Sequence, residues 1–336
     1  MKTPYIIAAV LAVSSCLGLP SEDSPMGEAV FSVREETKAV PGVSETAISH
    51  WSVMLFDTGN PAACYWGSSD SGADITCVAR KGRSYRAYAI ANYPKDGPGT
   101  FDPSMVSTEE ELRAFTSLLH GNSPSGLTMF GLENLTQLPT ARTPIGLTRL
   151  CSKVCIQKIT LDVTDPVYAG KEFILNALYL TNVYCAGTIW AYQTTPTSDA
   201  ALWYNAGGWH GSGSIDALDA LIGDRGLSQS ITNGGSYTVT HSFYAYPNAV
   251  ATDSRSATWS PRCTRLVIEA TFGGKRYYYP VTISDMKRNH NYIVSEAIIH
   301  GPGSRDPEEE IPGVIDVTLS ITPNIWDSEY YISEAS

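Results

Sequence analysis

The sequence predicts a mainly β protein with enough chain for two β-rich domains. The chain has 336 residues, of which only 17 % are charged. Tyr, Thr, Ser and Gly, which favour strands and turns over helices, are plentiful, and apolar residues alternate along much of the chain. The formal net charge of −11 argues against a nucleic-acid partner and against attraction to anionic membranes.

The N-terminal segment has the pattern of an exported lipoprotein. A basic start, Met1-Lys2, precedes an apolar run over residues 5–13 that is too short to span a bilayer. The sequence VSSC follows and resembles a lipobox that ends at Cys16, the residue we expect to carry the lipid. We therefore predict a signal peptide over residues 1–15 and a flexible tether over residues 16–28. The alternative is an ordinary secretory signal in which this Cys is incidental.

Strand patterns follow the tether. Ala29, Phe31 and Val33 share one face of a predicted strand over residues 29–33. The apolar segment HWSVMLFD predicts a buried strand that ends at a turn containing Gly and Pro. The strands and extended runs predicted in this half cover residues 29–33, 50–57, 85–92 and 147–163.

One helix is predicted, over residues 107–120. Ser107 or Thr108 can cap its N-terminus, and Glu109–Glu111 suit the positive end of the helix dipole. Gly121 is expected to end it. The apolar stripe of this helix consists of Leu112, Phe115, Leu118 and Leu119.

The second half of the chain predicts more strands separated by polar loops. Gly273-Gly274 lies between two strand patterns and predicts a hairpin turn. The predicted strands cover residues 173–183, 237–246, 265–272, 277–283, 291–299 and 314–321. The predicted loops cover residues 204–215, 224–236 and 301–310.

Six cysteines remain once Cys16 is set aside. Disulfides and buried free thiols both stay open, because six cysteines allow fifteen pairings. A metal site is disfavoured, since Cys151 and Cys155 have no His near them and the chain contains no C-x-x-C motif.

No residue pattern predicts catalysis. Ser212 and Ser214 do not lie in a G-x-S-x-G motif, and the acidic runs 109–111 and 308–310 are typical of solvated faces. The six His residues are scattered singly. We therefore predict no enzyme and no catalytic, cofactor or metal site.

Several segments resemble the fimbrillin family of Bacteroidales, whose members build pili from lipoprotein precursors. The lipobox is one of them, and the densest match lies after residue 240. The matching segments are ETKAVPG (36–42), VMLFDTGN (53–60), LTRLCSKVCIQKI (147–159), FYAYPN (243–248), TRLVIEATFGGKRYYYPV (264–281), RNHNYIVSEAIIHGPGSRDPEEEI (288–311) and IDVTLSITPNIW (315–326).

This resemblance implies a fold and a location. It implies two tandem β-sandwich (transthyretin-like) domains, with a short helix in the first. We expect these domains over residues 29–187 and 188–336. The protein would be attached to outer-membrane lipid through Cys16 and would belong to a fimbrium at the cell surface.

The resemblance also implies how subunits join. A trypsin-like protease specific for Arg or Lys would cut after the first strand, and Arg34 and Lys38 are the candidate sites. The strand carrying Phe31 and Val33 would then be displaced. The end of another pilus subunit, residues 324–336, would replace it. The donor residues on one face of that segment are Trp326, Tyr330 and Ile332.

Two other functions stay open. A tip adhesin or glycan-binding lipoprotein would bind a glycan or host receptor, with Trp203, Tyr204 and Trp209 stacking on sugars. A permanently lipidated anchor subunit would keep residues 16–34 in its mature form.

Overall fold

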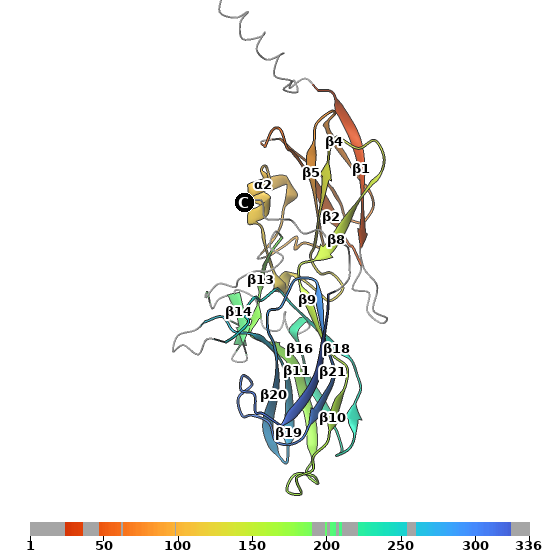
Figure 1. Ribbon diagram of the computed structural model, residues 1–336. Helices are drawn as coiled ribbons and strands as arrows, with labels where there is room; N and C mark the ends of the chain where they lie inside the picture. Colours follow the sequence, from red (N-terminus) through yellow and green to blue (C-terminus); the bar gives the residue numbers. More distant parts are fainter. Residues whose placement is uncertain are drawn as a thin grey trace, which may run out of the picture.

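The computed structural model describes residues 24–35, 47–61, 63–97, 99–189, 199, 202–205, 208–209, 221–253 and 260–323. Strands make up 52 % of it and helices 6 %, which confirms the predicted mainly β class. Figure 1 shows the strands gathered in an upper and a lower group along the long axis of the molecule.

The upper group is one seven-stranded sheet with the order β3-β2-β5-β7-β8-β1-β4. The strands predicted over residues 29–33, 50–57 and 85–92 are confirmed as β1, β2 and β5. The strands of this sheet are β1 (Met26–Glu35), β2 (Trp51–Asp57), β3 (Cys64–Ser69), β4 (Ile75–Arg80), β5 (Tyr85–Ala91), β7 (Met129–Leu135) and β8 (Thr143–Arg149).

The strands β2 and β5 are apolar on both faces because the sheet separates two hydrophobic cores. Trp51, Val53 and Leu55 of β2 pack with Phe31 of β1 in the first core. Their neighbours on β2, such as Phe56, point into the second core. Alternation in a strand thus supplies both cores, and no side chain of β2 is exposed.

The short helix α2 (Glu109–Ala114) covers the second core. A capping box between Thr108 and Glu111 starts the helix. The prediction that it continues to residue 120 is wrong, because the backbone of Phe115 is already extended. After α2 the chain forms β6 (Thr116–Leu118) and the 3-10 helix η2 (Leu119–Gly121). Another 3-10 helix, η1 (Pro103–Met105), precedes α2.

The predicted helical stripe fails because strand pairing overrides it. β6 pairs antiparallel with β13 (Ala186–Thr188), far away in the sequence. Leu112 and Leu119 are both buried in the second core. The apolar residues of the predicted stripe therefore do pack in the core, although only the first part of the stripe is helical. Tertiary contacts of this kind outweigh helix propensity.

The lower group consists of two facing sheets and a small three-stranded one. The six-stranded sheet contains β9 (Ser152–Ile156), β10 (Ile159–Leu161), β17 (Ser236–Tyr237), β18 (His241–Ala245), β21 (His290–Ile299) and β22 (Ile315–Pro323). The four-stranded sheet contains β11 (Phe173–Thr181), β16 (Gly223–Ser230), β19 (Thr264–Phe272) and β20 (Lys275–Ile283). The small sheet contains β12 (Val183–Tyr184), β14 (Trp203–Asn205) and β15 (Gly208–Trp209).

Most predictions for this half are confirmed. β11 and β19 to β22 lie at the predicted positions, and Gly273-Gly274 forms the hairpin turn with positive φ angles of 56° and 77°. The strand predicted over residues 237–246 is divided into β17 and β18, and β14 and β15 lie within or next to the loop predicted over residues 204–215. The loop predicted over residues 224–236 is wrong, since β16 occupies its first part and pairs with β11. β16 is polar because it is an edge strand whose side chains are mostly exposed.

The chain passes from the upper to the lower group of strands before residues 187 and 188, where the domain boundary was predicted. The extended run 147–163 is broken into β8, β9 and β10, and only β8 belongs to the upper sheet. The second core also runs through both groups, since it joins Phe56 and Tyr88 to Tyr292. The two groups of strands therefore share one continuous core.

The remaining cysteines are free thiols, of which five are buried and Cys64 is half-buried. The buried-thiol alternative is therefore confirmed over disulfides. Within the described ranges, no group of three or more His, Cys, Asp or Glu is arranged to hold a metal ion. The described part of the chain also has no helix long and apolar enough to cross a membrane.

Candidate functional site

The strand β1 is built into the interior of the upper group. Its inward residues are Ala29, which is 2 % exposed, Phe31, which is 0 % exposed, and the half-buried Val33. Full burial of a phenyl side chain is worth about 1.5–3 kcal/mol. This alternation is the pattern expected from the sequence.

The strand β1 links β4 to the rest of its sheet. Its first half pairs antiparallel with β4, from Met26 to Phe31, and its second half pairs parallel with β8, from Phe31 to Glu35. Phe31 is level with both Ile75 of β4 and Thr143 of β8. We call the space that β1 fills between β4 and β8 the β1 slot. Without β1, backbone groups on both neighbouring strands would lose their partners.

A thiol lies beside the strand at its smallest residue. Cys77 of β4 is directly opposite Ala29 and is 1 % exposed. Burial raises the pKa of Cys77 to about 12, and the nearby Cys64 adds to this. The thiol is therefore protonated and unreactive at neutral pH while β1 is in place.

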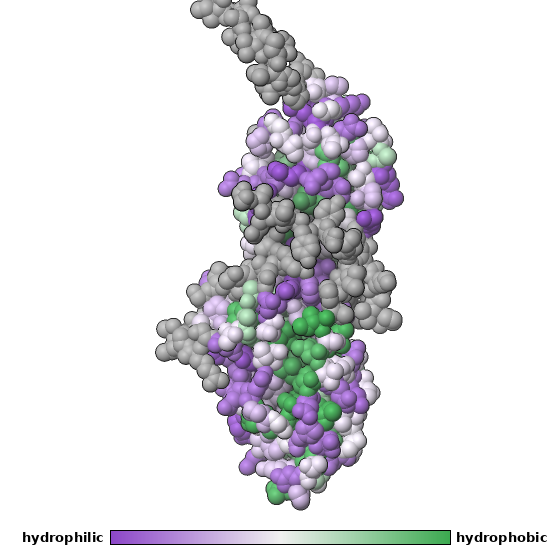
Figure 2. All heavy atoms as spheres, viewed as in Figure 1, coloured by the Kyte–Doolittle hydropathy of each residue, from purple (hydrophilic) through white to green (hydrophobic). Residues whose placement is uncertain are grey.

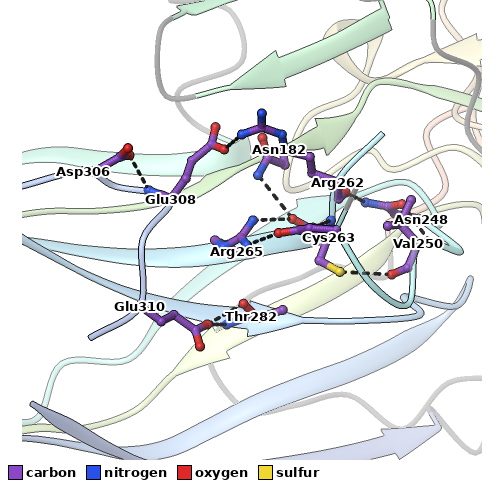
Figure 3. Close-up of polar contacts among 11 residues, drawn as sticks. Asn182, Asn248, Val250, Arg262, Cys263, Arg265, Thr282, Asp306, Glu308 and Glu310 are labelled. Carbon is purple, nitrogen blue, oxygen red and sulfur yellow. Dashed lines mark hydrogen bonds and ion pairs between the residues drawn. The ribbon is translucent and has the colours of Figure 1, made fainter. Parts of the chain in front are cut away.

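A second polar cluster lies in the lower group, around the start of β19 (Figure 3). Arg262 pairs with Glu308, and Arg265 pairs with Asp253, whose other oxygen accepts the backbone N–H of Cys263 at 2.7 Å. Although burial raises the pKa of Asp253, its bonds to Arg265 and to Cys263 hold it below the usual value.

The same cluster covers one sheet edge. Glu310 accepts hydrogen bonds from the backbone N–H (3.0 Å) and the hydroxyl of Thr282 on β20 (Figure 3). Ser304 forms two backbone hydrogen bonds with Tyr278, each 2.9 Å long. The segment that follows β21 therefore occupies the free edge of β20, and the acidic run 308–310 has a structural role.

Known structures resemble about nine tenths of the chain. A candidate cell adhesion protein from Bacteroides eggerthii aligns with a TM-score of 0.62 at 18 % identity, covering 90 % of this chain and 98 % of that one. A fimbrilin from Porphyromonas gingivalis aligns with a TM-score of 0.58 at 14 % identity, covering 88 % and 97 %. The tip fimbrial protein Mfa3 from the same species aligns with a TM-score of 0.54 at 13 % identity, covering 89 % and 100 %.

The chain has the fold of the Bacteroidales fimbrillins. The resemblance noted in the sequence is thus confirmed at the level of fold. No protein-family model and no curated protein sequence matches the chain.

On this fimbrillin fold, the predicted site residues fall into two sets. Phe31, Val33 and Arg34 are described, and all three belong to β1. The expectation that Arg34 lies in a link after the first strand is wrong, since it is still level with Gly146 of β8. Its side chain is exposed, and beyond Phe31 no described residue of β4 pairs with β1. The second set lies outside the described residues and consists of Cys16, Lys38, Trp326, Tyr330 and Ile332.

The aromatic residues considered for glycan stacking are also placed. Trp203 and Tyr204 are each 0 % exposed. The ring of Trp203 packs on Tyr184 with centroids 5.2 Å apart, and the hydroxyl of Tyr204 accepts a hydrogen bond from Arg225. Neither ring faces solvent, so neither can stack on a sugar. The side chain of Trp209 lies outside the described part of the chain.

Sequence reasoning placed Ala29 on the inward face of the first strand, but it did not single out Cys77 or the pairing of the two residues. Both follow from register, which depends on the pairing of β1 with β4. The alternation of Ile75, Cys77 and Ala79 would have indicated an inward face for β4, but the alternation does not reveal its partner.

Proposed function

We propose that the chain is a structural subunit of a cell-surface fimbria that assembles by protease-triggered strand exchange. The observation that carries the proposal is the place of β1, an N-terminal strand whose inward residues fill a hydrophobic core and whose backbone joins β4 to β8. The fimbrial and adhesion proteins with this fold support a fimbrial role.

The proposed path begins at the membrane. The chain is exported with a lipid on Cys16 and is held at the outer membrane by the tether predicted over residues 16–28, whose last three residues are already part of β1. It folds as two tandem transthyretin-like domains, for which sheet membership favours a boundary near residue 150. A protease then cuts at Arg34 or Lys38, and β1 leaves with the lipid.

Loss of β1 makes the remaining sheet unstable alone. Backbone groups of β4 and β8 become unpaired, and the apolar side chains around Phe31 meet water. A strand from a neighbouring subunit, residues 324–336, restores both, which is β-strand addition used for assembly. The exposed side chain of Arg34, near the end of β1, suits the protease.

A hydrophobic surface supports contacts between subunits. Figure 2 shows hydrophobic residues gathered on one face of the lower group, in the region of β18 and β21 in Figure 1. Contiguous apolar surface of this kind is typical of contact sites between proteins. A neighbouring subunit that donates its strand would also cover part of this face.

The test uses lipid-free full-length protein and a trypsin-like protease. Cutting is expected to make Cys77 reactive to a maleimide and to produce filaments visible by electron microscopy. Arg34→Ala/Lys38→Ala should stay monomeric with Cys77 protected, whereas Lys171→Ala, a change at another exposed basic residue, should behave as the wild type. Filaments from the double variant would refute the proposal.

The alternative roles predict different masses. The protein extracted from the cell surface should begin at Glu35 or Ala39 if it is a stalk or tip subunit, and at an acylated Cys16 if it is an anchor. A tip adhesin remains a second candidate because Mfa3, a tip fimbrial protein, has the same fold. It would bind a receptor and would not assemble with copies of itself.

A further inference from the structure

We infer that the donor segment enters the β1 slot in the same direction as β1, with Ser328 at the position of Ala29, Tyr330 at that of Phe31 and Ile332 at that of Val33. This inference rests on the proposed strand exchange and adds to it a register, a direction and a second copy of this chain as the partner.

The β1 slot has a defined profile of side-chain size. It is narrow at Ala29, where Cys77 lies opposite. It is deepest at Phe31, which is fully buried and level with both neighbouring strands. It is of intermediate size at Val33, which is half-buried and level with Ile145 of β8. From the start of the slot, the profile is small, aromatic and β-branched.

The donor segment repeats this profile. On one face of an extended chain it presents Ser328, Tyr330 and Ile332, which are small, aromatic and β-branched in the same order. No Pro follows Pro323, so each backbone N–H in this stretch can join the sheet.

The other arrangements fit worse. The reverse direction also places Tyr330 at Phe31, but it forces Ile332 against Cys77 and leaves Ser328 where Val33 fills the core. The opposite face of the segment would bury Asp327 and Glu329 without partners. A shift of two residues in either direction places an aromatic ring at Ala29. One shift also puts Glu334 at the position of Val33, and the other puts Ser328 at that of Phe31.

The outward positions define where the match is loose. Among them, Asp327 falls at the exposed Glu28. The match is also loose at Gly27, on the same face as Ala29 and Phe31, where Trp326 would have to displace the flexible side chain of Lys81. Tyr331 falls at Ser32, which is 5 % exposed, so this is the outward position where volume changes most. Tyr331 is therefore expected to add nothing to binding.

Disulfide trapping tests the register directly. In the inferred register, Ser328→Cys places a thiol opposite Cys77 of the next subunit, at a spacing that a disulfide can bridge. A mild oxidant such as copper phenanthroline takes up two electrons as two thiols release two protons and form one S–S bond. After cutting by the protease, covalent dimers and longer multimers are expected for Ser328→Cys but not for Glu329→Cys, or for Ser328→Cys combined with Cys77→Ser.

The other outcomes are equally specific. Dimers from Ile332→Cys in place of Ser328→Cys would show the reverse direction and overturn the inference. Filaments that form without a disulfide from Ser328→Cys would overturn the register alone. Filaments from protein truncated after Pro323 would overturn the proposed strand exchange itself.

A pair of adjacent tyrosines supplies a matched control. Tyr330→Ala should weaken assembly by about 100-fold or more, because an aromatic side chain is lost from a core position. Tyr330→Phe should assemble as well as the wild type, since the slot already holds a phenyl ring. Tyr331→Ala should assemble at least as well as the wild type. A larger loss with Tyr331→Ala than with Tyr330→Ala contradicts the register.

Discussion

At the scale of single residues, Phe31 connects the stability of the fold to the proposed assembly. It packs with Trp51, Val53 and Leu55 in a core that the N-terminal strand completes. Its neighbour Val30 faces the other way and is half-buried. Because the two residues are adjacent on the same strand, substituting each in turn distinguishes the contribution of the buried core from that of the strand itself.

Phe31→Ala is expected to lower the free energy of unfolding of the uncut protein by about 3–5 kcal/mol, because it leaves a cavity in a core position. Val30→Ala should cost less than about 1.5 kcal/mol. Chemical denaturation measures both, and maleimide labelling of Cys77 should speed up only in the first variant. Equal losses of unfolding free energy in the two variants would show that the inward face of β1 stabilises the fold no more than the outward face.

His300 is a residue whose environment predicts a pH effect. One ring nitrogen is 3.0 Å from the carbonyl of Asp162 and the other is 3.0 Å from the carboxylate of Asp316. Only the protonated ring donates to both acceptors. The bond to the Asp162 carbonyl, followed by the bond to Asp316, raises the pKa of His300.

A raised pKa means that this bond stabilises the fold below pH about 6.5 and that the effect is lost as pH rises through the higher folded value. His300→Gln should therefore lose up to about 1 kcal/mol near pH 5.5 and almost nothing near pH 8.5, since the pair is at the surface. Thermal unfolding at both pH values measures this. A difference that grows with rising pH would contradict it.

His241 provides the opposite case. Its side chain is largely buried and lies 3.2 Å from Asp224. Burial lowers the pKa of His241 in spite of that carboxylate. Its neutral form is therefore favoured in the fold, and its contribution should be lost as pH falls below about 6.5.

At the scale of elements, α2 shows how a short helix is fixed to a sheet. The capping box closes its N-terminus, and Glu109 accepts a hydrogen bond from Tyr88 of β5 and pairs with Arg86 and Arg113. An isolated helix of six residues would not be stable. The sheet beneath it therefore holds it in place.

Thr108→Ala should cost about 1 kcal/mol, because the N–H of Glu111 loses its acceptor. Glu110→Gln, at an exposed position of the same turn, should be neutral to within about 0.5 kcal/mol. Equilibrium denaturation compares the two variants. A neutral Thr108→Ala would show that the cap does not stabilise this helix.

The elements also show what the sequence could and could not predict. Regular alternation located β1 and β5, because one or both faces of these strands meet a core. The break after Arg149 was missed, since both sides of it are apolar and only the sheet partners change. The polar strand β16 was missed because an edge strand need not be apolar. Lys38 and the donor residues remain predictions.

At the scale of the whole molecule, a buried network joins the two groups of strands. The guanidinium of Arg288 donates to the backbone oxygens of Arg149 (3.0 Å) and Ile189 (2.9 Å) and to the hydroxyl of Thr148 (3.0 Å). Tyr246 donates to Ser117 at 2.7 Å, close to where β6 pairs with β13. These bonds and the continuous core link the two groups.

Arg288→Met is expected to lower the free energy of unfolding by about 3 kcal/mol or more, because three buried acceptors lose their donor. It should also split a single thermal transition in calorimetry into two. Arg305→Met removes a guanidinium that lies over Tyr277 at the surface and should leave one transition. One transition with unchanged stability in Arg288→Met would show that the network does not join the groups.

The course of β1 has a mechanical consequence. The strand runs along the long axis of the molecule (Figure 1) and is bonded along its length, first to β4 and then to β8. A pull along that axis loads these bonds in shear, so that they must fail together, whereas a sideways pull peels them apart one at a time. A strand seated in the place of β1 would inherit this geometry, and a filament built from such joints would resist stretching far better than bending.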